Sequence, residues 1–280
     1  MDPIVTPAAM SEADARAVAA GTPVETLVER AGRAVAWAGR RLVGGCYGRR
    51  VVVVCGKGNN GADGLVAARV LRGWGMVVET VELAASLDRP AVTRAIRRAD
   101  LVIDAMYGTG LRGALDGDAA WVAAELGSVA AQVLAVDIPS GVDGTTGAVG
   151  GAVVAADATI TFAAPKPGLR FEPGRTLAGV VEVADIGIAV DEDLVGALEL
   201  DRADVLDLVP SRPVDAHKWR ASVLVVGGSG GMTGAPMLAS RAAMRSGAGM
   251  VVCGLPGDDA AHRAAGAEVI TRVLPALDDG

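Results

Sequence analysis

The residues best suited to chemistry form a short glycine-rich stretch that follows a run of apolar residues. Residues 56–64 read GKGNNGADG, after four valines and a cysteine. An apolar run of this length predicts a strand buried on both faces, and the apolar, arginine-bearing pattern that follows favours a helix from residue 64 to 74. A strand, a glycine turn and a helix N-terminus together can bind an anion, because the first helical N–H groups have no partner within the helix. The stretch therefore predicts a site for a nucleotide or a phosphorylated cofactor.

The same stretch matches a dinucleotide-binding pattern, which leaves an alternative open. Residues 56–61 fit G-x-G-x-x-G, and Glu79 lies eighteen residues past the last glycine, as in a Rossmann-type NAD(P)-dependent oxidoreductase. Asp63 argues against that class, because a carboxylate in the first turn of the helix would repel a pyrophosphate. Asn59 and Asn60 offer both donors and acceptors to a ligand or an ion. The plainer alternative is a turn capped by asparagine that binds nothing.

Two further predicted strands end in acidic residues. Asp104 and Asp137 stand at these ends, and Ser140 follows three residues after the second. Because the carboxyl ends of parallel strands meet at one edge of a sheet, we expect them to lie beside Asn60. Amide, carboxylate and hydroxyl oxygens suit a monovalent or hard divalent cation, and not zinc. Asp137, near such an ion and a ligand, is a candidate general acid or base. For Asp104 the alternative is a cap of the following turn; Arg112 could pair with a phosphate.

Other polar residues favour structural roles. Lys166 follows an apolar strand, and an exposed loop lysine is favoured over one that reaches a phosphate or substrate. His217 and His262 are the two histidines, and both lie late in the chain, so histidine cannot drive chemistry in the first part. The three cysteines lack metal-binding spacing and indicate reduced thiols in a cytosolic protein: Cys46, Cys55 and Cys253.

Composition excludes two classes of partner. The 280 residues carry 26 basic and 33 acidic side chains, a net charge of −7, with no basic stripe, which excludes nucleic-acid binding. The most apolar stretch, residues 147–164, contains Asp157 and several glycines, so it predicts a loop and a core strand and not a membrane span. The N-terminus lacks a basic-then-apolar leader. We expect a cytoplasmic protein that acts on a small molecule.

The elements that must position these residues alternate between strands and helices. Two helices lead the chain, one from Ser11 and one from Pro23 to about Val43. The strands are expected at 51–55, 76–83, 101–105, 132–137, 158–164 and 179–183, and further helices at 64–74, 90–98 and 118–126. This alternation predicts a three-layer, Rossmann-like α/β domain with a mainly parallel sheet. The leading helices are a candidate contact for a homo-oligomer.

A second segment begins after a change in composition at residues 201–213, where aspartates and prolines favour a linker. A strand is expected at 222–226, a glycine turn at 227–231, a helix at 236–246 and a strand at 251–255. About seventy residues are few for a complete α/β domain, which usually has roughly 100–200. We therefore expect two domains, 1–208 and 209–280, of which the second is the opening of a larger one.

Three separated motifs resemble the NAD(P)H-hydrate epimerases: GNNGADG at 58–64, Asp104 with GTG at 108–110, and DIPSG at 137–141. The resemblance covers about residues 1–205. It implies interconversion of the R and S epimers of hydrated NADH or NADPH, with Asp137 as the proton-transfer residue and a potassium ion bound by Asn60, Asp104 and Ser140. It also implies substrate contacts at Asn59, Asn60, Gly61, Ala62, Asp63, Gly108, Thr109, Gly110, Leu111, Arg112, Gly113, Ala114 and Asp137. Ala62 replaces a usual glycine, and we expect it to be tolerated.

The second segment resembles the start of an ADP/ATP-dependent NAD(P)H-hydrate dehydratase, a ribokinase-like fold. The matches are HKW at 217–219, GGSGGMTGAP at 227–236 and RSGAG at 245–249, and Ala235 falls on a substrate-binding position. The later glycine-rich loop of that family, with its catalytic aspartate and nucleotide site, has no counterpart before Gly280. We expect an incomplete ribokinase-like α/β segment without dehydratase activity, ADP or ATP being a cofactor only of a complete domain. Its uncovered apolar face should make residues 211–280 mobile or adhesive.

Three functions are thus weighed against one another. An oxidoreductase predicts tight binding of intact NAD and hydride transfer. A non-catalytic nucleotide- or protein-binding module of the same fold predicts loss of the oxygen ligands or of Asp137. All of these residues are present, so the epimerase is the favoured interpretation.

Overall fold

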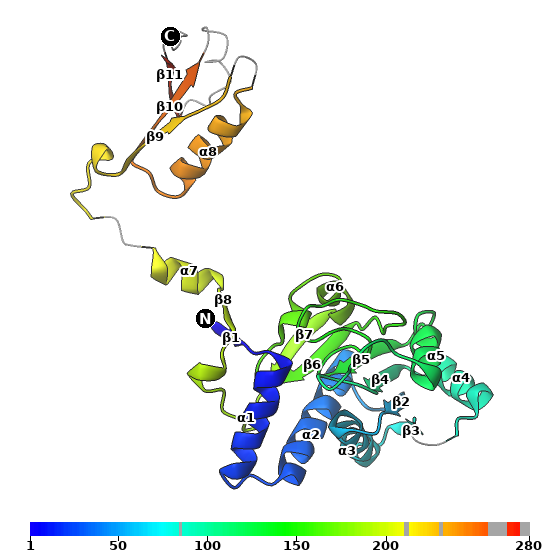
Figure 1. Ribbon diagram of the computed structural model, residues 1–280. Coiled ribbons are helices and arrows are strands. Elements are labelled where there is room, and N and C mark those ends of the chain that lie inside the picture. The colour runs from blue at the N-terminus through cyan, green and yellow to red at the C-terminus, as the bar shows by residue number, and fades with distance from the viewer. Residues whose placement is uncertain (84–85, 210–212, 230–231, 257–267, 275–280) are drawn as a thin grey trace. The chain divides into compact units, whose positions relative to one another are not determined.

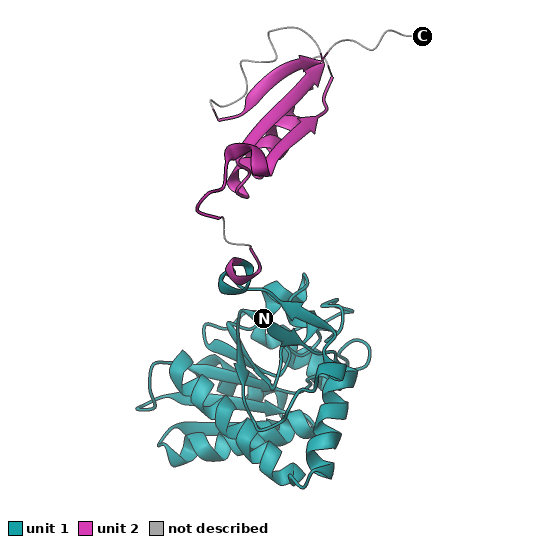
Figure 2. Ribbon diagram, turned by 90° about the vertical axis from the view of Figure 1, so that its left-hand side faces the viewer, with its two compact units in different colours: residues 1–205 teal, residues 206–280 magenta. Residues whose placement is uncertain are grey.

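The computed structural model describes residues 1–83, 86–209, 213–229, 232–256 and 268–274. The chain divides into two compact units, Met1–Val205 and Leu206–Gly280, which are described separately (Figure 2). The first unit ends at Val205, three residues before the boundary expected after residue 208. Parts of the expected linker (210–212) and of the second glycine turn (230–231), together with His262, lie outside the described residues.

The first unit is built on a six-stranded sheet in which every neighbouring pair is parallel. The order across the sheet is β3 (Val77–Glu82), β2 (Arg50–Cys55), β4 (Leu101–Ala105), β5 (Gln132–Val136), β6 (Ala158–Phe162) and β7 (Val180–Ala184). This confirms the α/β fold with a mainly parallel sheet. All the strand ends expected to carry chemistry therefore meet at one edge.

Helices cover both faces of this sheet, because successive strand residues point to opposite sides. Val51, Val53 and Cys55 pack in one core with helices α1 (Pro7–Ala19), α2 (Val24–Leu42) and α3 (Asn59–Gly73). Val52 and Val54 pack in the other core with α4 (Arg89–Arg98) and α5 (Gly117–Leu126). The result is the three-layer arrangement seen in Figure 1.

Two helices begin earlier than the sequence predicts. Helix α1 begins at Pro7 instead of Ser11, because the hydroxyl of Thr6 caps it by accepting from the Ala9 N–H at 3.2 Å and proline suits the first helical position. Helix α3 begins at Asn59 instead of residue 64. The glycine–asparagine stretch is thus the first turn of the helix, and Asp63 lies in the second turn, not the first.

Two glycines allow this early start of α3. A Cβ at Gly61 would lie 1.9 Å from the carbonyl oxygen of Gly56, and a Cβ at Gly56 would lie 1.9 Å from that of Met106. Both positions therefore need glycine for backbone packing. Gly58 differs, because no atom lies within 4 Å of its Cβ position. The space beside Gly58 is open to a ligand.

The sequence missed several short elements that hold the two ends of the first unit together. Strand β1 (Asp2–Ile4) pairs antiparallel with β8 (Ala197–Glu199). Helix α7 (Arg202–Leu208) occupies much of the expected linker, and the N-terminal ammonium pairs with Asp204 at 2.6 Å. The remaining short helices are α6 (Gly174–Ala178) and the 3₁₀ helices η1 (Pro167–Leu169), η2 (Glu192–Leu194) and η3 (Lys218–Ala221). No described helix is long and apolar enough to cross a membrane.

The second unit contains a parallel three-stranded sheet in the order β11 (Ile270–Leu274), β10 (Met250–Pro256) and β9 (Ser222–Val226). Helix α8 (Gly234–Arg245) packs on it through Met237, against Val251, Cys253 and Leu255. Leu224 is 67% exposed and Val226 is 60% exposed. The expected uncovered apolar side chains are present, whereas the ribokinase-like assignment stays a prediction.

Candidate functional site

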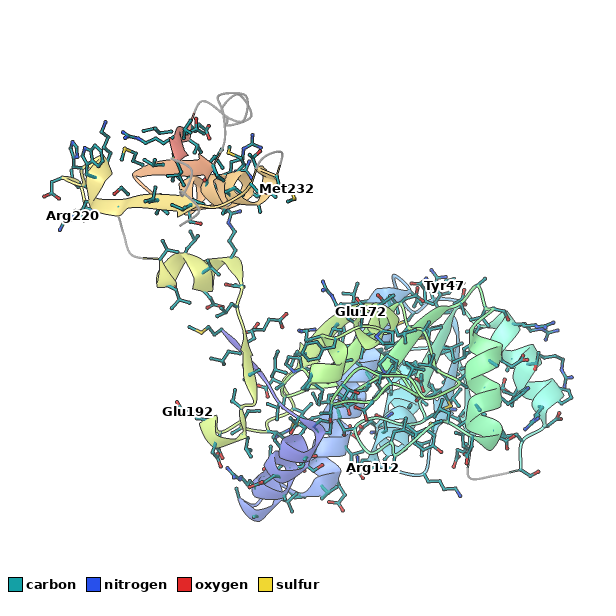
Figure 3. The ribbon with its side chains drawn as sticks, turned by 45° about the horizontal axis from the view of Figure 1, so that its top comes forward. Tyr47, Arg112, Glu172, Glu192, Arg220 and Met232 are labelled. Carbon is teal, nitrogen blue, oxygen red and sulfur yellow. The ribbon has the colours of Figure 1, made fainter. Side chains whose placement is uncertain are left out.

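A cavity of about 580 Å³ in the first unit gathers the loops at the carboxyl edge of the sheet. The stretch after β2, the glycine loop after β4 and the turn after β5 all contribute to its lining. The expected site residues among the lining are Asn59, Asn60, Asp63, Gly108, Thr109, Gly110, Arg112 and Asp137. Arg112, labelled in Figure 3, comes from the loop between β4 and α5. The parallel-sheet rule therefore brought three separated motifs to one place.

One wall of the cavity was missed from the sequence. It comes from α1 and α2 and from a segment after β7, and includes Ser11, Asp14, Leu27, Ile186 and Ile188. Sequence reasoning placed the leading helices only at a dimer contact, which stays a prediction. The wall could not be read from local pattern, because it joins residues that are far apart in the chain.

Asp137 is the most constrained side chain of the site. Its φ is 67°, a left-handed conformation that is uncommon outside glycine, asparagine and aspartate. Oδ2 accepts from the Thr109 N–H at 3.0 Å, and Oδ1 accepts from the Thr161 hydroxyl at 3.1 Å and from the Lys166 ammonium at 2.8 Å. Burial acts to raise the pKa of Asp137, but Lys166 and these hydrogen bonds outweigh it and hold the pKa below its usual value. Asp137 is therefore an ionised, oriented base at neutral pH.

Lys166 is not the exposed loop lysine that the sequence favoured; that prediction is wrong. Its side chain is 1% exposed. Besides the ion pair with Asp137, the ammonium donates to the Thr161 hydroxyl at 2.8 Å and to the Phe162 carbonyl at 3.1 Å. Strand β1 leads into the same region, since the Val5 N–H donates to the Pro165 carbonyl at 3.0 Å. The prolines on both sides of Lys166 were the available sign of a fixed loop.

Asp104 and Ser140 form a buried pair between two strand ends. Asp104 Oδ2 accepts from the Ser140 N–H at 2.8 Å, and Oδ1 accepts from the Ser140 hydroxyl at 2.7 Å and the Met106 N–H at 3.2 Å. The Met106 bond is the turn cap considered as the alternative role, whereas the role of Asp104 as an ion ligand stays a prediction. Burial raises the pKa of Asp104 to about 6, against the lowering effect of these hydrogen bonds. Among the described residues, no lysine, arginine or histidine forms a salt bridge with Asp104.

Asn60 approaches Asp137 beside Gly108. A Cβ at Gly108 would lie 3.1 Å from Asn60 Oδ1 and 2.7 Å from Asp137 Oδ2, so glycine is needed for the two side chains to converge. Asn60 Nδ2 is buried and has no hydrogen-bond partner among the described residues. The described residues hold no group of three or more His, Cys, Asp or Glu side chains that could bind a metal. A cation here would depend on the oxygens of Asn60, Asp104, Ser140 and the backbone.

Asp63 and Asp14 are two further carboxyls of the cavity. Burial raises the pKa of Asp63 to about 8, with smaller contributions from Asp137 and Asp14. Asp63 is thus mainly protonated at pH 7, and repels a pyrophosphate less than its charge in the sequence suggested. Burial also raises the pKa of Asp14, Lys166 opposes this, and Asp137 adds to it.

Some expected substrate contacts lie outside the cavity lining. Gly61 serves backbone packing, and Leu111 packs against the core on the α4–α5 face. The residues not among the lining are Gly61, Ala62, Leu111, Gly113 and Ala114. Ala235 belongs to α8 of the second unit.

Glu79, the acidic residue of the dinucleotide pattern, lies in the middle of β3. It is paired in register with Val52, whereas Glu82 is paired with Cys55 at the carboxyl end. A ribose-binding acid is expected at that end, beside the glycine turn. Glu79 therefore does not fit the role that the oxidoreductase interpretation requires.

Comparison with known proteins agrees with this geometry. A family model described as YjeF-related protein N-terminus matches residues 24–98 and 82–168, together more than half of the chain. The bifunctional NAD(P)H-hydrate repair enzyme Nnr of Moorella thermoacetica is 38% identical over 84% of this chain and 50% of its own length. The proteins of the same name from Salinibacter ruber and Escherichia coli K12 are 36% and 35% identical, over 99% and 72% of this chain and 59% and 44% of their own lengths.

The chain thus spans about half the length of the curated relatives it matches. Among solved structures, the crystal structure of yeast ynu0, YNL200c, is similar with a TM-score of 0.57. That similarity covers 68% of this chain and 91% of the yeast chain at 22% sequence identity. It supports the fold of the first unit.

Proposed function

The chain belongs to the family of YjeF-related protein N-termini, and we propose that it interconverts the R and S epimers of hydrated NADH or NADPH. The observation that carries this proposal is the oriented carboxylate of Asp137 in the lining of the cavity. The names of the relatives, which are NAD(P)H-hydrate repair enzymes, supply the substrate class.

The chemistry of the substrate suits a carboxylate. Hydration of the enamine double bond places a hydroxyl on a ring carbon next to the nitrogen. When that hydroxyl leaves, the nitrogen lone pair forms a C=N bond and the ring becomes a cation. A fixed carboxylate stabilises a positive charge that develops beside it, and it can accept a proton from the water that adds back. Asp137 has both properties.

The open space beside Gly58 supports a binding site for the pyrophosphate of the substrate. No atom lies within 4 Å of its Cβ position, and Gly58, Lys57 and Arg112 all line the cavity. The first N–H groups of α3 lie next to Gly58, and such groups bind phosphate oxygens. The pyrophosphate would bind there, with the hydrated ring toward Asp137.

Asn60, Asp104 and Ser140 would hold a potassium ion. Asp104 is fully buried, and its carboxylate and the Ser140 hydroxyl offer oxygens that suit a hard monovalent cation, to which the amide oxygen of Asn60 would be added,. The ion would supply positive charge that fixes three strand ends. Replacing potassium by tetramethylammonium should lower the epimerisation rate, and Asp104→Asn should remove the dependence on potassium. A rate independent of the cation would contradict the site.

The direct test mixes the purified chain with pure R epimer of hydrated NADH in potassium buffer and follows both epimers by chromatography. Faster appearance of the S epimer than the spontaneous rate supports the proposal. A folded chain that gives no acceleration contradicts it, and favours the non-catalytic binding module. Tight binding of intact NAD with hydride transfer to a carbonyl substrate would favour the oxidoreductase instead.

Dehydration is a separate question. The prediction that residues 209–280 have no ADP- or ATP-dependent dehydratase activity stays a prediction, and the same is true of the role of Ala235. Incubation of the chain with the S epimer and ATP tests it. Formation of NADH in proportion to ATP consumed would contradict it.

A further inference from the structure

Two carboxyls of the cavity form no hydrogen bond or salt bridge with any residue that the structure describes. Asp63 is 6% exposed and lines the cavity from α3, and Asp14 lines it from α1. No hydrogen bond or salt bridge from a described residue contributes to the state of either carboxyl, only burial and nearby charges. Both carboxyls therefore face the cavity, where a bound substrate can reach them.

The proposed reaction needs more than one proton-transfer group. Epimerisation removes a hydroxyl from one face of a carbon and returns it to the other face. Asp137 is held at both oxygens, by Thr109, Thr161 and Lys166, so it cannot swing from one face to the other. A rigid base therefore serves one face, and the other face needs its own donor.

The other candidates in the cavity are less suited to that role. Lys166 directs its ammonium protons to Asp137, Thr161 and Phe162, and has none left for a substrate. Lys57 is exposed to solvent and Asp14 is half-buried. Asp63 is the enclosed group with a free carboxyl.

On the basis of the proposed epimerase function, we propose that Asp63 is a second catalytic residue, whose carboxyl donates the proton to the departing hydroxyl while Asp137 serves the opposite face. The C–O bond breaks and its electron pair leaves with the oxygen as water, while the nitrogen lone pair forms the C=N bond. A water molecule then adds to the other face and gives a proton to Asp137, and the nitrogen regains its lone pair. One proton has left Asp63 and one has reached Asp137; the reverse turnover or exchange with solvent restores both.

The surroundings of the two carboxyls favour Asp63 as the acid and Asp137 as the base. The groups that face Asp63 are Asp137 on the β5 edge, with Lys166 beyond it, and Asp14 on α1. On the neighbouring α2, Glu29 is engaged with Arg33 and Arg69 at the surface. Burial first, and then the charges of Asp137 and Asp14, raise the pKa of Asp63, whereas Lys166 and the hydrogen bonds to Asp137 outweigh burial and lower the pKa of Asp137. An acid and a base in one site require such a difference.

The test compares Asp63→Asn and Asp63→Glu with wild type and with Glu79→Gln, a control at an exposed acidic residue of β3. We expect Asp63→Asn to lower kcat about 100-fold or more, the usual contribution of a general acid, with KM changed less than about 3-fold. Asp63→Glu should recover part of the rate, and Glu79→Gln should match wild type. The wild-type kcat should fall above about pH 8, as the acid form of Asp63 is lost, and the residual rate of Asp63→Asn should lack this fall.

The outcomes separate this inference from the proposed function. An inactive wild type contradicts the epimerase itself. An active wild type whose Asp63→Asn variant keeps its kcat overturns the inference alone. A wild-type kcat that stays constant from pH 6 to 10 also overturns it, and needs no variant. In water enriched in ¹⁸O, each epimerisation should introduce the label at the hydrated carbon; product that keeps its original oxygen would exclude the proposed step.

Discussion

Two strands of similar composition, one in each unit, differ in how far their apolar side chains are buried. Strand β2 of the first unit and strand β9 of the second are both short, valine-rich and parallel to their neighbours. Val53 is 0% exposed, because helices cover both faces of its sheet, whereas Leu224 is 67% exposed. An apolar strand sequence thus favours burial on both faces, but the strand becomes buried only where helices cover both faces of its sheet.

The same contrast holds for buried polar groups. The first unit buries Asp63, Asp104, Asp137 and Lys166, whereas among the described residues of the second unit only Ser240 is a buried polar side chain. Ser240 is satisfied locally, since its hydroxyl donates to the Pro236 carbonyl at 2.7 Å. Buried charge is costly unless it is paired, so its concentration in the first unit indicates where function lies.

The largest difference should appear in activity. We expect Asp137→Asn to lower epimerisation by at least about 1,000-fold, because an amide can neither accept the proton nor stabilise the cation. The left-handed conformation at residue 137 suits asparagine, but the variant leaves the buried Lys166 ammonium without its carboxylate partner, so stability should fall as well. Leu238→Gln in the second unit should leave the rate unchanged. Circular dichroism and epimer chromatography together measure this, and a fully active Asp137→Asn would remove the distinction between the units.

Replacing one glycine in each unit by alanine should have different effects on stability. Gly61→Ala places a Cβ 1.9 Å from a backbone oxygen, so it should lower the free energy of unfolding by about 3 kcal/mol or more. Gly234 begins α8 and has no atom within 4 Å of its Cβ position, so Gly234→Ala should change stability by less than about 1 kcal/mol. Urea unfolding of both variants measures the difference. Equal losses would mean that the close packing around α3 is not specific.

Matched truncations in the two strands should differ by a smaller amount. Val53→Ala leaves a cavity in a closed core and should cost about 2 kcal/mol. Leu224→Ala removes an exposed side chain and should cost less than about 0.5 kcal/mol. Thermal unfolding of the two variants, each against wild type, measures the gap. A large loss from Leu224→Ala would show that this face is covered in solution.

The smallest effect should be a dependence of stability on pH. The pKa of Asp63 is raised to about 8 in the folded chain, above its unfolded value of about 3.9. At Asp63 the folded state therefore binds more protons than the unfolded state, and the contribution of Asp63 to stability falls as pH rises from about 4 to 8. Asp63→Asn removes this loss, so its melting temperature should gain on wild type between pH 5 and 9. Water in the cavity screens part of the charge, which keeps the gain small; a constant difference in melting temperature would contradict it.

The sequence predicted features that depend on residues near one another in the chain, and it missed those that depend on contacts between distant residues. The pairing of Asp104 with Ser140 and the approach of Asn60 to Asp137 followed from one rule about parallel strands, because each residue lies near a strand end. The start of α3 was misplaced, since it depends on contacts of Gly56 with Met106, fifty residues away. The burial of Lys166 and the cavity wall of Asp14 arise only when α1 packs against the sheet. No local pattern contains such information.

The pairing of β1 with β8 also bears on the order in which the chain can fold as it is made. Pro3 is paired with Leu198, and the cavity wall is incomplete until Ile188 is present. At ~5–20 residues per second, ribosomal synthesis separates the two partners by about 10–40 s. During that interval, the first strand has no partner, and the central strands can already pair with their neighbours. Assembly on the ribosome would therefore proceed from the middle of the first unit outward, and the ligand site would be the last part to close.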